Sequence, residues 1–190
     1  MHLCLFEDFH SSNFLSLTYF RPVYDLRCGM LTLRERIVSH LLPKSVSLFA
    51  REYLAAVLRE ENPGLDVNKV SANACLFVNG RTIMSVTLAR QLKQADDDCL
   101  FVNGEQIVAV RLSGKNLSKA MSSNYADAID LSNVVGLQKI EVEKHLCELV
   151  NGTLVEKPMG YYESRVAMVL SHFLLSFIIP RRLGGVSGEA

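Results

Sequence analysis

Short apolar runs alternate with amphipathic stretches along the N-terminal half of the chain. The runs His2–Phe6 and Val46–Phe49 predict short buried strands. Apolar residues at helical spacing predict helices from Met30 to Leu42, over Arg51–Glu61 and over Val86–Gln94. Because strands and helices alternate, we expect an α/β domain whose parallel sheet is covered by helices.

The letters CLFVNG occur twice, at Cys75–Gly80 and at Cys99–Gly104. Each copy is an apolar strand that ends in Asn-Gly, and both of these residue types tolerate the positive φ angles of tight hairpin turns. The second copy is followed by the partly alternating run EQIVAVRL, which suits a returning strand. We therefore predict a hairpin turn at Asn79 in the first copy as well as at the end of the second.

The composition is that of a globular protein, with 49% hydrophobic residues and 20 cationic against 20 anionic side chains. A formally neutral chain gives no electrostatic reason to expect a nucleic-acid partner. The 5 cysteines are odd in number and widely spaced, which favours reduced, buried thiols over a disulfide framework or a zinc site. The N-terminus lacks the features of a signal peptide, so we expect a cytoplasmic protein.

Two groups of charged residues are interpreted as solvated. Arg51 and the other charged residues of the helix over Arg51–Glu61 predict a solvent-facing helix surface. Asp96, Asp97 and Asp98 precede a strand and have no spaced set of further ligands, so we interpret them as a solvated loop and not as a metal site.

The densest group of chemically informative residues is Leu15–Ile37, with the sequence LSLTYFRPVYDLRCGMLTLRERI. Its proline fixes its own φ angle and favours an extended Arg21. Asp25 stands between Arg21 and Arg27, and Gly29 allows the backbone to turn. A strand, a long loop and a helix with cations at its start can bind an anion such as phosphate. The same residues also suit an ordinary strand-to-helix connection whose arginines form structural salt bridges.

The pattern LxLTxxRPxxDLRxGMLTLRE in this segment resembles the N-terminal signature of an atypical group of bacterial sugar nucleotidyltransferases, related to N-acetylglucosamine-1-phosphate uridylyltransferase. The resemblance is dense at the N-terminus and looser as far as Gly136. It implies an incomplete Rossmann-like nucleotidyltransferase domain over residues 1–136. Such a domain would join a nucleoside triphosphate to a sugar 1-phosphate, release pyrophosphate and use Mg²⁺ as a cofactor.

The resemblance also implies a set of site residues. The nucleotide site would be lined by Thr18, Arg21, Asp25, Arg27 and Gly29. Arg21 and Arg27 would be the catalytic residues, because they would neutralise the triphosphate, and Asp25 would orient them. No metal ligand is implied, since ordinary uridylyltransferases carry a metal-binding aspartate after an apolar strand, and the loosely corresponding residue here is Asn79.

Residues 137–190 differ in composition from those before them. A further Asn-Gly hairpin is predicted over Leu149–Val155, followed by an amphipathic helix over 161–179 that is too short and too polar for a membrane span. The run ELVNGTLVEKPMG and the residues after it resemble the opening of Uma-type endonuclease-like proteins of the PD-(D/E)xK superfamily. This resemblance implies a truncated α+β hairpin–helix fragment, because the chain stops at Ala190, before that family's metal-binding elements. If nothing covers the apolar face of the helix, the chain should self-associate through it.

The leading function predicted from sequence is therefore sugar-1-phosphate nucleotidyl transfer. Its partners would be a nucleoside triphosphate and a sugar phosphate, with neither a membrane nor a nucleic acid involved. The alternatives are a nuclease-like fragment and a non-catalytic fusion remnant. Sequence alone leaves open whether the chain turns over substrate, which nucleotide and sugar it uses, and whether its two parts are a true gene fusion or a truncated reading frame.

Overall fold

The computed structural model describes residues 1–95, 97–121, 136–142, 148–150 and 153–155. The chain divides into two compact units, Met1–Leu154 and Val155–Ala190. Of the second unit only Val155 is described, so the helix predicted over 161–179 lies outside the described residues. In the described part of the chain, no helix is long and apolar enough to cross a membrane.

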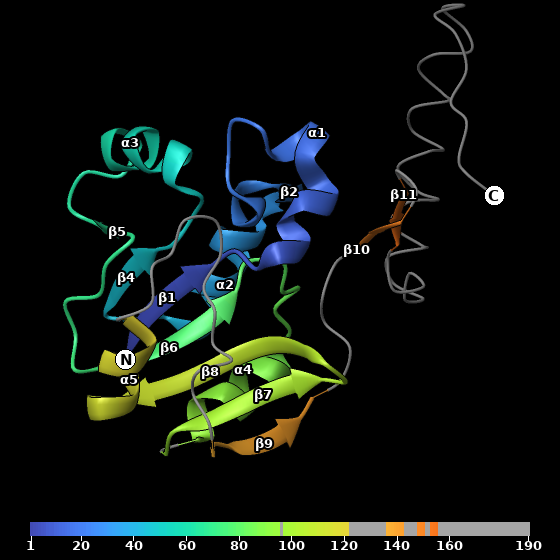
Figure 1. Cartoon of the computed structure of the whole chain (residues 1–190). Coiled ribbons are helices and arrows are strands. Elements are labelled where there is room, and N and C mark those ends of the chain that lie inside the picture. The colour runs from blue at the N-terminus through green and yellow to red at the C-terminus, as the bar shows by residue number, and fades with distance from the viewer. Residues whose placement is uncertain (96, 122–135, 143–147, 151–152, 156–190) are drawn as a thin grey trace, which may run out of the picture. The chain divides into compact units, whose positions relative to one another are not determined.

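The first unit is built around a seven-stranded sheet (Figure 1). In their order across the sheet the strands are β5 (Asp66–Val67), β4 (Ser45–Leu48), β1 (His2–Phe6), β6 (Ala74–Asn79), β8 (Gln106–Ser113), β7 (Cys99–Asn103) and β9 (Gln138–Glu141). Neighbouring strands pair in parallel except where β8 lies between β6 and β7 and is antiparallel to both. The predicted α/β fold with a parallel-dominated sheet is thus confirmed.

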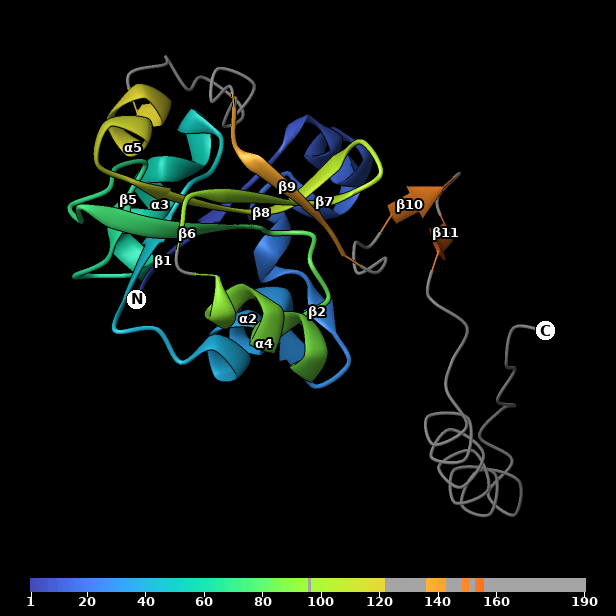
Figure 2. The same cartoon turned by 90° about the horizontal axis from the view of Figure 1, so that it is seen from below.

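Helices cover both faces of this sheet. They are α2 (Leu33–Leu41), α3 (Glu52–Glu61), α4 (Val86–Gln94) and α5 (Gly114–Met121). Figure 2 shows α2 and α4 on one face of the sheet and α5 on the other. Successive side chains of β1 point to opposite faces of the sheet and so belong to two hydrophobic clusters. Leu3 and Leu5 belong to the cluster with residues of α2, α3 and α4, whereas Cys4 and Phe6 belong to the cluster with residues of α5.

A long segment, residues 7–32, connects β1 to α2. It contains the 3₁₀ helices η1 (Phe9–Phe14) and η2 (Val23–Asp25), the short helix α1 (Leu15–Thr18), and a small hairpin of β2 (Arg27–Cys28) and β3 (Leu31–Thr32). The helix predicted from Met30 begins only at Leu33, because Thr32 caps it. The Thr32 hydroxyl accepts from the Glu35 N–H, and the Glu35 carboxylate accepts from the Thr32 N–H, which is a capping box.

The two CLFVNG copies have different structures. The second copy forms the predicted hairpin: β7 is followed by Gly104, whose φ is +59°, and β8 returns beside it. The hairpin predicted at Asn79 is wrong. The Thr82 N–H donates to the Asn79 carbonyl at 3.0 Å and closes a turn, but the chain then proceeds to α4. Gly80 instead extends the pairing of β6 with β1, because its N–H donates to the Phe6 carbonyl at 2.7 Å.

One further sequence prediction meets a different structure. Cys4 and Cys75 form a disulfide between β1 and β6, so the prediction that all cysteines are reduced is wrong for this pair. Cys28 and Cys99 are free thiols. Strand β9, which follows residue 136, pairs in parallel with β7 at the edge of the large sheet. The strands β10 (Glu148–Val150) and β11 (Thr153–Val155) form a separate two-stranded sheet where the third Asn-Gly hairpin is predicted.

Candidate functional site

The strand order reverses at β1. From β1 the chain passes through α2 to β4 on one side, whereas β6, on the other side of β1, leads through α4 to β7. The connections after β1 and β6 therefore leave in opposite directions. In open α/β sheets, such a point forms a crevice at the carboxyl ends of the strands, where ligands bind. The long segment 7–32 follows β1 at this point.

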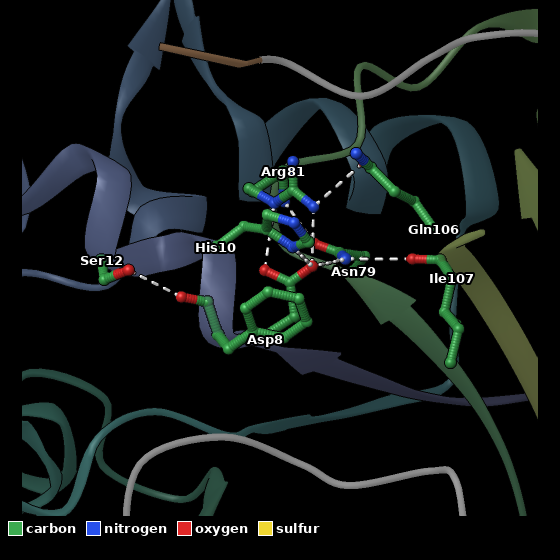
Figure 3. A network of polar contacts seen from close by, with 8 residues as sticks. Asp8, His10, Ser12, Asn79, Arg81, Gln106 and Ile107 are labelled. Carbon is green, nitrogen blue, oxygen red and sulfur yellow. Dashed lines mark hydrogen bonds and ion pairs between the residues drawn. The ribbon is translucent and has the colours of Figure 1, made fainter. Parts of the chain in front are cut away.

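A charged network joins the carboxyl ends of β1 and β6 (Figure 3). Asp8, two residues after the end of β1, accepts hydrogen bonds from Arg81 Nε at 3.1 Å and from Arg81 Nη2 at 2.6 Å. The Asn79 amide also donates to Asp8, at 2.9 Å, and its carbonyl oxygen accepts from the Arg81 N–H at 3.0 Å. Arg81 and Asn79 are both fully buried. The network therefore fixes the loop after β6 to the loop after β1.

His10 is the partly exposed member of this network. Its Nδ1 lies 3.4 Å from Asp8 Oδ2, and 28% of its side chain is exposed. Burial alone would raise the pKa of Asp8, but the hydrogen bonds and charge of Arg81, together with the Asn79 amide, hold that pKa below its ordinary value. Asp8 is therefore a carboxylate at neutral pH, and it can orient the His10 ring.

A second ion pair fixes the segment 7–32 to the start of α3. The carboxylate of Glu7, which is 1% exposed, accepts from Arg51 Nε at 3.1 Å and from the Val23 N–H at 2.7 Å. Arg51 Nη2 also donates to the carbonyl oxygens of Thr18 at 2.8 Å and Arg21 at 3.1 Å. The prediction that Arg51 lies on a solvated helix face is wrong. This arginine precedes the helix, and its side chain is buried in contact with the segment 7–32.

The residues predicted from resemblance lie along this segment, with different exposures. Thr18 is buried and its hydroxyl donates to the Phe14 carbonyl at 2.8 Å. The side chains of Arg21 and Arg27 are exposed, and Arg27 Nη1 donates to the Met30 carbonyl at 3.3 Å. Gly29 has a φ of +75° at the turn between β2 and β3, where a side chain would be strained.

Asp25 pairs with a different arginine from the ones predicted. Its carboxylate lies 2.7 Å from Arg34 Nε, on the first turn of α2. We expected Asp25 to orient Arg21 and Arg27, whereas the ion pair that it forms in the structure is with Arg34. Burial raises the pKa of Asp25 to about 6 against the opposing effect of Arg34. The nearby carboxylates Glu61 and Glu7 raise the pKa further.

Comparison with known proteins identifies the family of the chain. The family model of the sugar nucleotidyl transferases matches residues 3–158. The chain belongs to this family. No curated protein gives a match.

Among solved structures, this sugar nucleotidyl transferase chain is similar to the inositol-1-phosphate CTP transferase from T. maritima, with 12% sequence identity and a TM-score of 0.49 over 74% of this chain and 84% of that one. It is also similar to a nucleotidyl transferase from Methanothermobacter, with 12% identity and a TM-score of 0.47 over 92% of this chain and 97% of that one.

Among the residues that the structure describes, the carboxylates at this edge of the sugar nucleotidyl transferase sheet do not fit a magnesium site. Glu7, Asp8 and Asp25 each already pair with an arginine. A protein-held Mg²⁺ normally takes one or two free carboxylate oxygens together with substrate phosphates and water. Asn79, at the position suggested for a metal ligand in ordinary relatives, uses its side chain on Asp8, Arg81 and the Ile107 carbonyl.

Sequence reasoning missed both ion pairs that organise the site. Glu7 and Arg51 are 44 positions apart, and Asp8 and Arg81 are 73 positions apart. One signal was present: each of these acids and bases directly follows, or closely follows, an apolar strand run. Charged residues at the carboxyl ends of parallel strands meet at one edge of the sheet.

The segment 7–32 also carries many exposed apolar side chains. The most exposed are Phe20 at 90% and Met30 at 91%, and the others are Phe9, Leu15, Leu17, Tyr19 and Leu31. Exposed arginines and exposed aromatic rings thus lie on the same segment. Such a combination suits a ligand with a phosphate group and a planar base.

Proposed function

We propose that this chain transfers a nucleotidyl group from a nucleoside triphosphate to a sugar 1-phosphate, with release of pyrophosphate. The observation that carries the proposal is the position of the segment 7–32. It stands at the carboxyl ends of β1 and β6, where the strand order reverses, and the Glu7–Arg51 ion pair holds it there. In this segment the side chains of Arg21 and Arg27 are exposed.

In the proposed reaction, a phosphate oxygen of the sugar 1-phosphate attacks the α-phosphorus of the triphosphate. A new P–O bond forms as the bond to the β-phosphate oxygen breaks, and pyrophosphate leaves with the negative charge. Charge stabilisation is the main catalytic contribution in such a transfer. Arg21 and Arg27 are therefore proposed to neutralise the triphosphate.

The other predicted site residues have supporting roles in this proposal. The Thr18 carbonyl, like that of Arg21, accepts from Arg51 and so fixes the backbone on which Arg21 stands. Asp25 with Arg34 fixes the start of α2, and Gly29 permits the turn beside Arg27. Because the carboxylates do not fit a magnesium site, no step is assigned to Mg²⁺, and its requirement is measured by adding or chelating it.

The proposal is tested by measuring pyrophosphate release and triphosphate binding. The purified chain is assayed with one nucleoside triphosphate and one sugar 1-phosphate at a time. The triphosphates are the four common ribonucleoside triphosphates and dTTP, and the sugar phosphates are a set of hexose and hexosamine 1-phosphates. Calorimetry with UTP and Mg²⁺ should show weak binding that Arg21→Ala and Arg27→Ala each reduce. A lost bidentate arginine–phosphate contact costs about 1.5–3 kcal/mol, which corresponds to roughly 10- to 150-fold in affinity.

Arg59→Ala is the matched control, because Arg59 is an exposed arginine on α3. It should bind UTP as the unchanged chain does. If the Arg21 and Arg27 variants both bind UTP as tightly as the unchanged chain, the assigned nucleotide site is contradicted. Triphosphate binding without pyrophosphate release from any substrate pair would show that the chain keeps the site and has lost turnover.

A further inference from the structure

A second cluster of chemically active side chains lies at the opposite edge of the sheet. His2 begins β1 and Cys75 lies near the start of β6, so both stand at the amino ends of their strands, whereas the candidate functional site stands at the carboxyl ends. A ring nitrogen of His2 and the sulfur atoms of Cys4 and Cys75 all lie within 4.8 Å of one another. Among the described residues, these three side chains are the ones whose ligand atoms lie close enough together to hold a metal ion.

The strand register explains why these three side chains meet. Residues His2 and Cys4 are two apart on β1, so they project from the same face of the sheet. β6 pairs in parallel with β1 and brings Cys75 beside them, with a Cα–Cα distance of 6.5 Å to Cys4. Both cysteines are buried, and His2 is partly exposed, so the cluster opens towards solvent at the histidine.

The His2 ring is held in place from the neighbouring strand. Its Nδ1 lies 2.6 Å from the Ser45 hydroxyl and its Nε2 lies 2.8 Å from the Ser47 hydroxyl. Ser45 and Ser47 stand opposite His2 and Cys4 in the β4 register. Histidines that bind metals usually keep a hydrogen bond at the second ring nitrogen, which fixes the ring orientation. Either serine can supply that bond while the other nitrogen binds a metal.

We propose that His2, Cys4 and Cys75 form a binding site for a thiophilic divalent cation such as Zn²⁺ when the two cysteines are reduced. Two thiolates and one imidazole are ligands that Zn²⁺ accepts and Mg²⁺ does not. Three protein ligands leave a fourth position for water. Two sulfurs at about 2.3 Å from a tetrahedral zinc ion lie roughly 3.7 Å apart, a spacing that the 6.5 Å between the Cα atoms permits.

Oxidation and metal binding exclude each other at this site. In the disulfide, each sulfur is bonded to the other and neither is a thiolate. A phosphine and water supply two electrons and two protons, which break the S–S bond and give two thiols while the phosphine becomes its oxide. Zn²⁺ then displaces one proton from each thiol. The site therefore links metal content to the redox state of the cysteines.

The test uses the full chain without an affinity tag, reduced with a phosphine and desalted without oxygen. Zn²⁺ is titrated in competition with a chromophoric chelator. We expect one Zn²⁺ per chain, loss of this binding in Cys4→Ala and Cys75→Ala, and at least tenfold weaker binding in His2→Ala. Cys28→Ala is the control, because Cys28 is a free thiol outside the cluster, and it should bind as the unchanged chain does.

A measurement on the unchanged chain covers the case in which a cysteine variant fails to fold. Zn²⁺ should protect Cys4 and Cys75 from alkylation and leave Cys28 reactive, as read by peptide mass analysis. Absence of stoichiometric zinc, zinc binding by the oxidised chain at the same affinity, or protection of no cysteine would each overturn the proposal. None of these outcomes depends on pyrophosphate release, so the metal site and the proposed function stand or fall separately.

Discussion

The ion pair of Glu7 and Arg51 should control the position of the whole segment 7–32. Arg51 is 6% exposed and donates to the Glu7 carboxylate and to the backbone carbonyls of Thr18 and Arg21. Replacing it by methionine keeps an unbranched side chain and removes all of these donors. Glu7 would then be a buried carboxylate whose remaining donors are the backbone N–H groups of Val23 and residue 51.

The expected loss of stability follows from the burial. Removing one partner of a buried ion pair costs about 3–5 kcal/mol, because the other charge is left uncompensated. Arg51 Nη1 is buried and, within the described residues, has no hydrogen-bond partner, so the loss should be at the lower end of that range. For a chain of this length, a loss of about 3 kcal/mol lowers Tm by roughly 6–12 °C. The double variant Glu7→Gln/Arg51→Met should recover more than half of the loss, since it leaves no unpaired charge.

The loss should also depend on pH. Burial already raises the pKa of Glu7 while Arg51 is present, and removing the arginine raises it further. Below that folded-state pKa, Glu7 in the Arg51→Met variant takes up a proton and the charge disappears. As the pH rises through this pKa, Glu7 loses the proton and the fold again contains an unpaired buried charge. The destabilisation should therefore be larger at pH 8 than at pH 5.

Urea denaturation at both pH values measures these differences, and hydrogen exchange shows where the structure opens. Exchange should increase in residues 7–32 and remain slow in α4. Arg59→Met, an exposed arginine on α3, serves as the control and should change the free energy of unfolding by less than about 0.5 kcal/mol. A loss below about 1 kcal/mol in Arg51→Met, or equal losses at the two pH values, would refute the role given to the buried pair.

Two further predictions concern Asp25, in the same segment, and Gly80, which lies against Tyr24 of that segment. Because the folded-state pKa of Asp25 is raised to about 6, its ionisation destabilises the fold, and stability from this group is lost as pH rises from about 4 to about 6. The free energy of unfolding of Asp25→Asn minus that of the unchanged chain should rise by up to about 3 kcal/mol over this range, and a flat difference would contradict the shift. A Cβ at Gly80 would lie 2.8 Å from Tyr24 Cδ1, so Gly80→Ala should cost about 1–3 kcal/mol and weaken triphosphate binding. Gly104→Ala, at a φ of +59° with no atom within 4 Å, should cost about 1 kcal/mol and leave binding unchanged.

The elements that local pattern determines were predictable from the sequence. The strand His2–Phe6 and the helix Val86–Gln94 have the predicted bounds. Both depend on interactions within a few residues, namely the apolar run of a buried strand and the helical spacing of an amphipathic helix. The start of α2 was misplaced although its signal was local, because Thr32 and Glu35 form a capping box inside the predicted helix.

The partners of the charged residues were not predictable in the same way. Whether Arg51 faces solvent or Glu7 depends on where the segment 7–32 lies, and no local pattern records that position. The predicted site residues illustrate the same limit. Resemblance placed Thr18, Arg21 and Arg27 on one segment, but the structure gives Thr18 a buried, bonded hydroxyl and leaves the two arginine side chains exposed.

The two copies of CLFVNG show how tertiary surroundings decide the structure of identical residues. Each copy forms a strand of the same sheet, so their local preference for extended backbone is satisfied in both. At the second copy, Gly104 is exposed, takes a positive φ and starts a hairpin. At the first, Gly80 is buried against Tyr24 and its N–H donates to the Phe6 carbonyl. Both sides of β6 are already paired, with β1 and β8, so a strand returning directly from Gly80 has no place beside it. An Asn-Gly turn signal therefore predicts a hairpin where the strand end meets solvent. At the buried end of β6, the Asn79 side chain instead bonds to Asp8 and Arg81, and Gly80 pairs with Phe6 of β1.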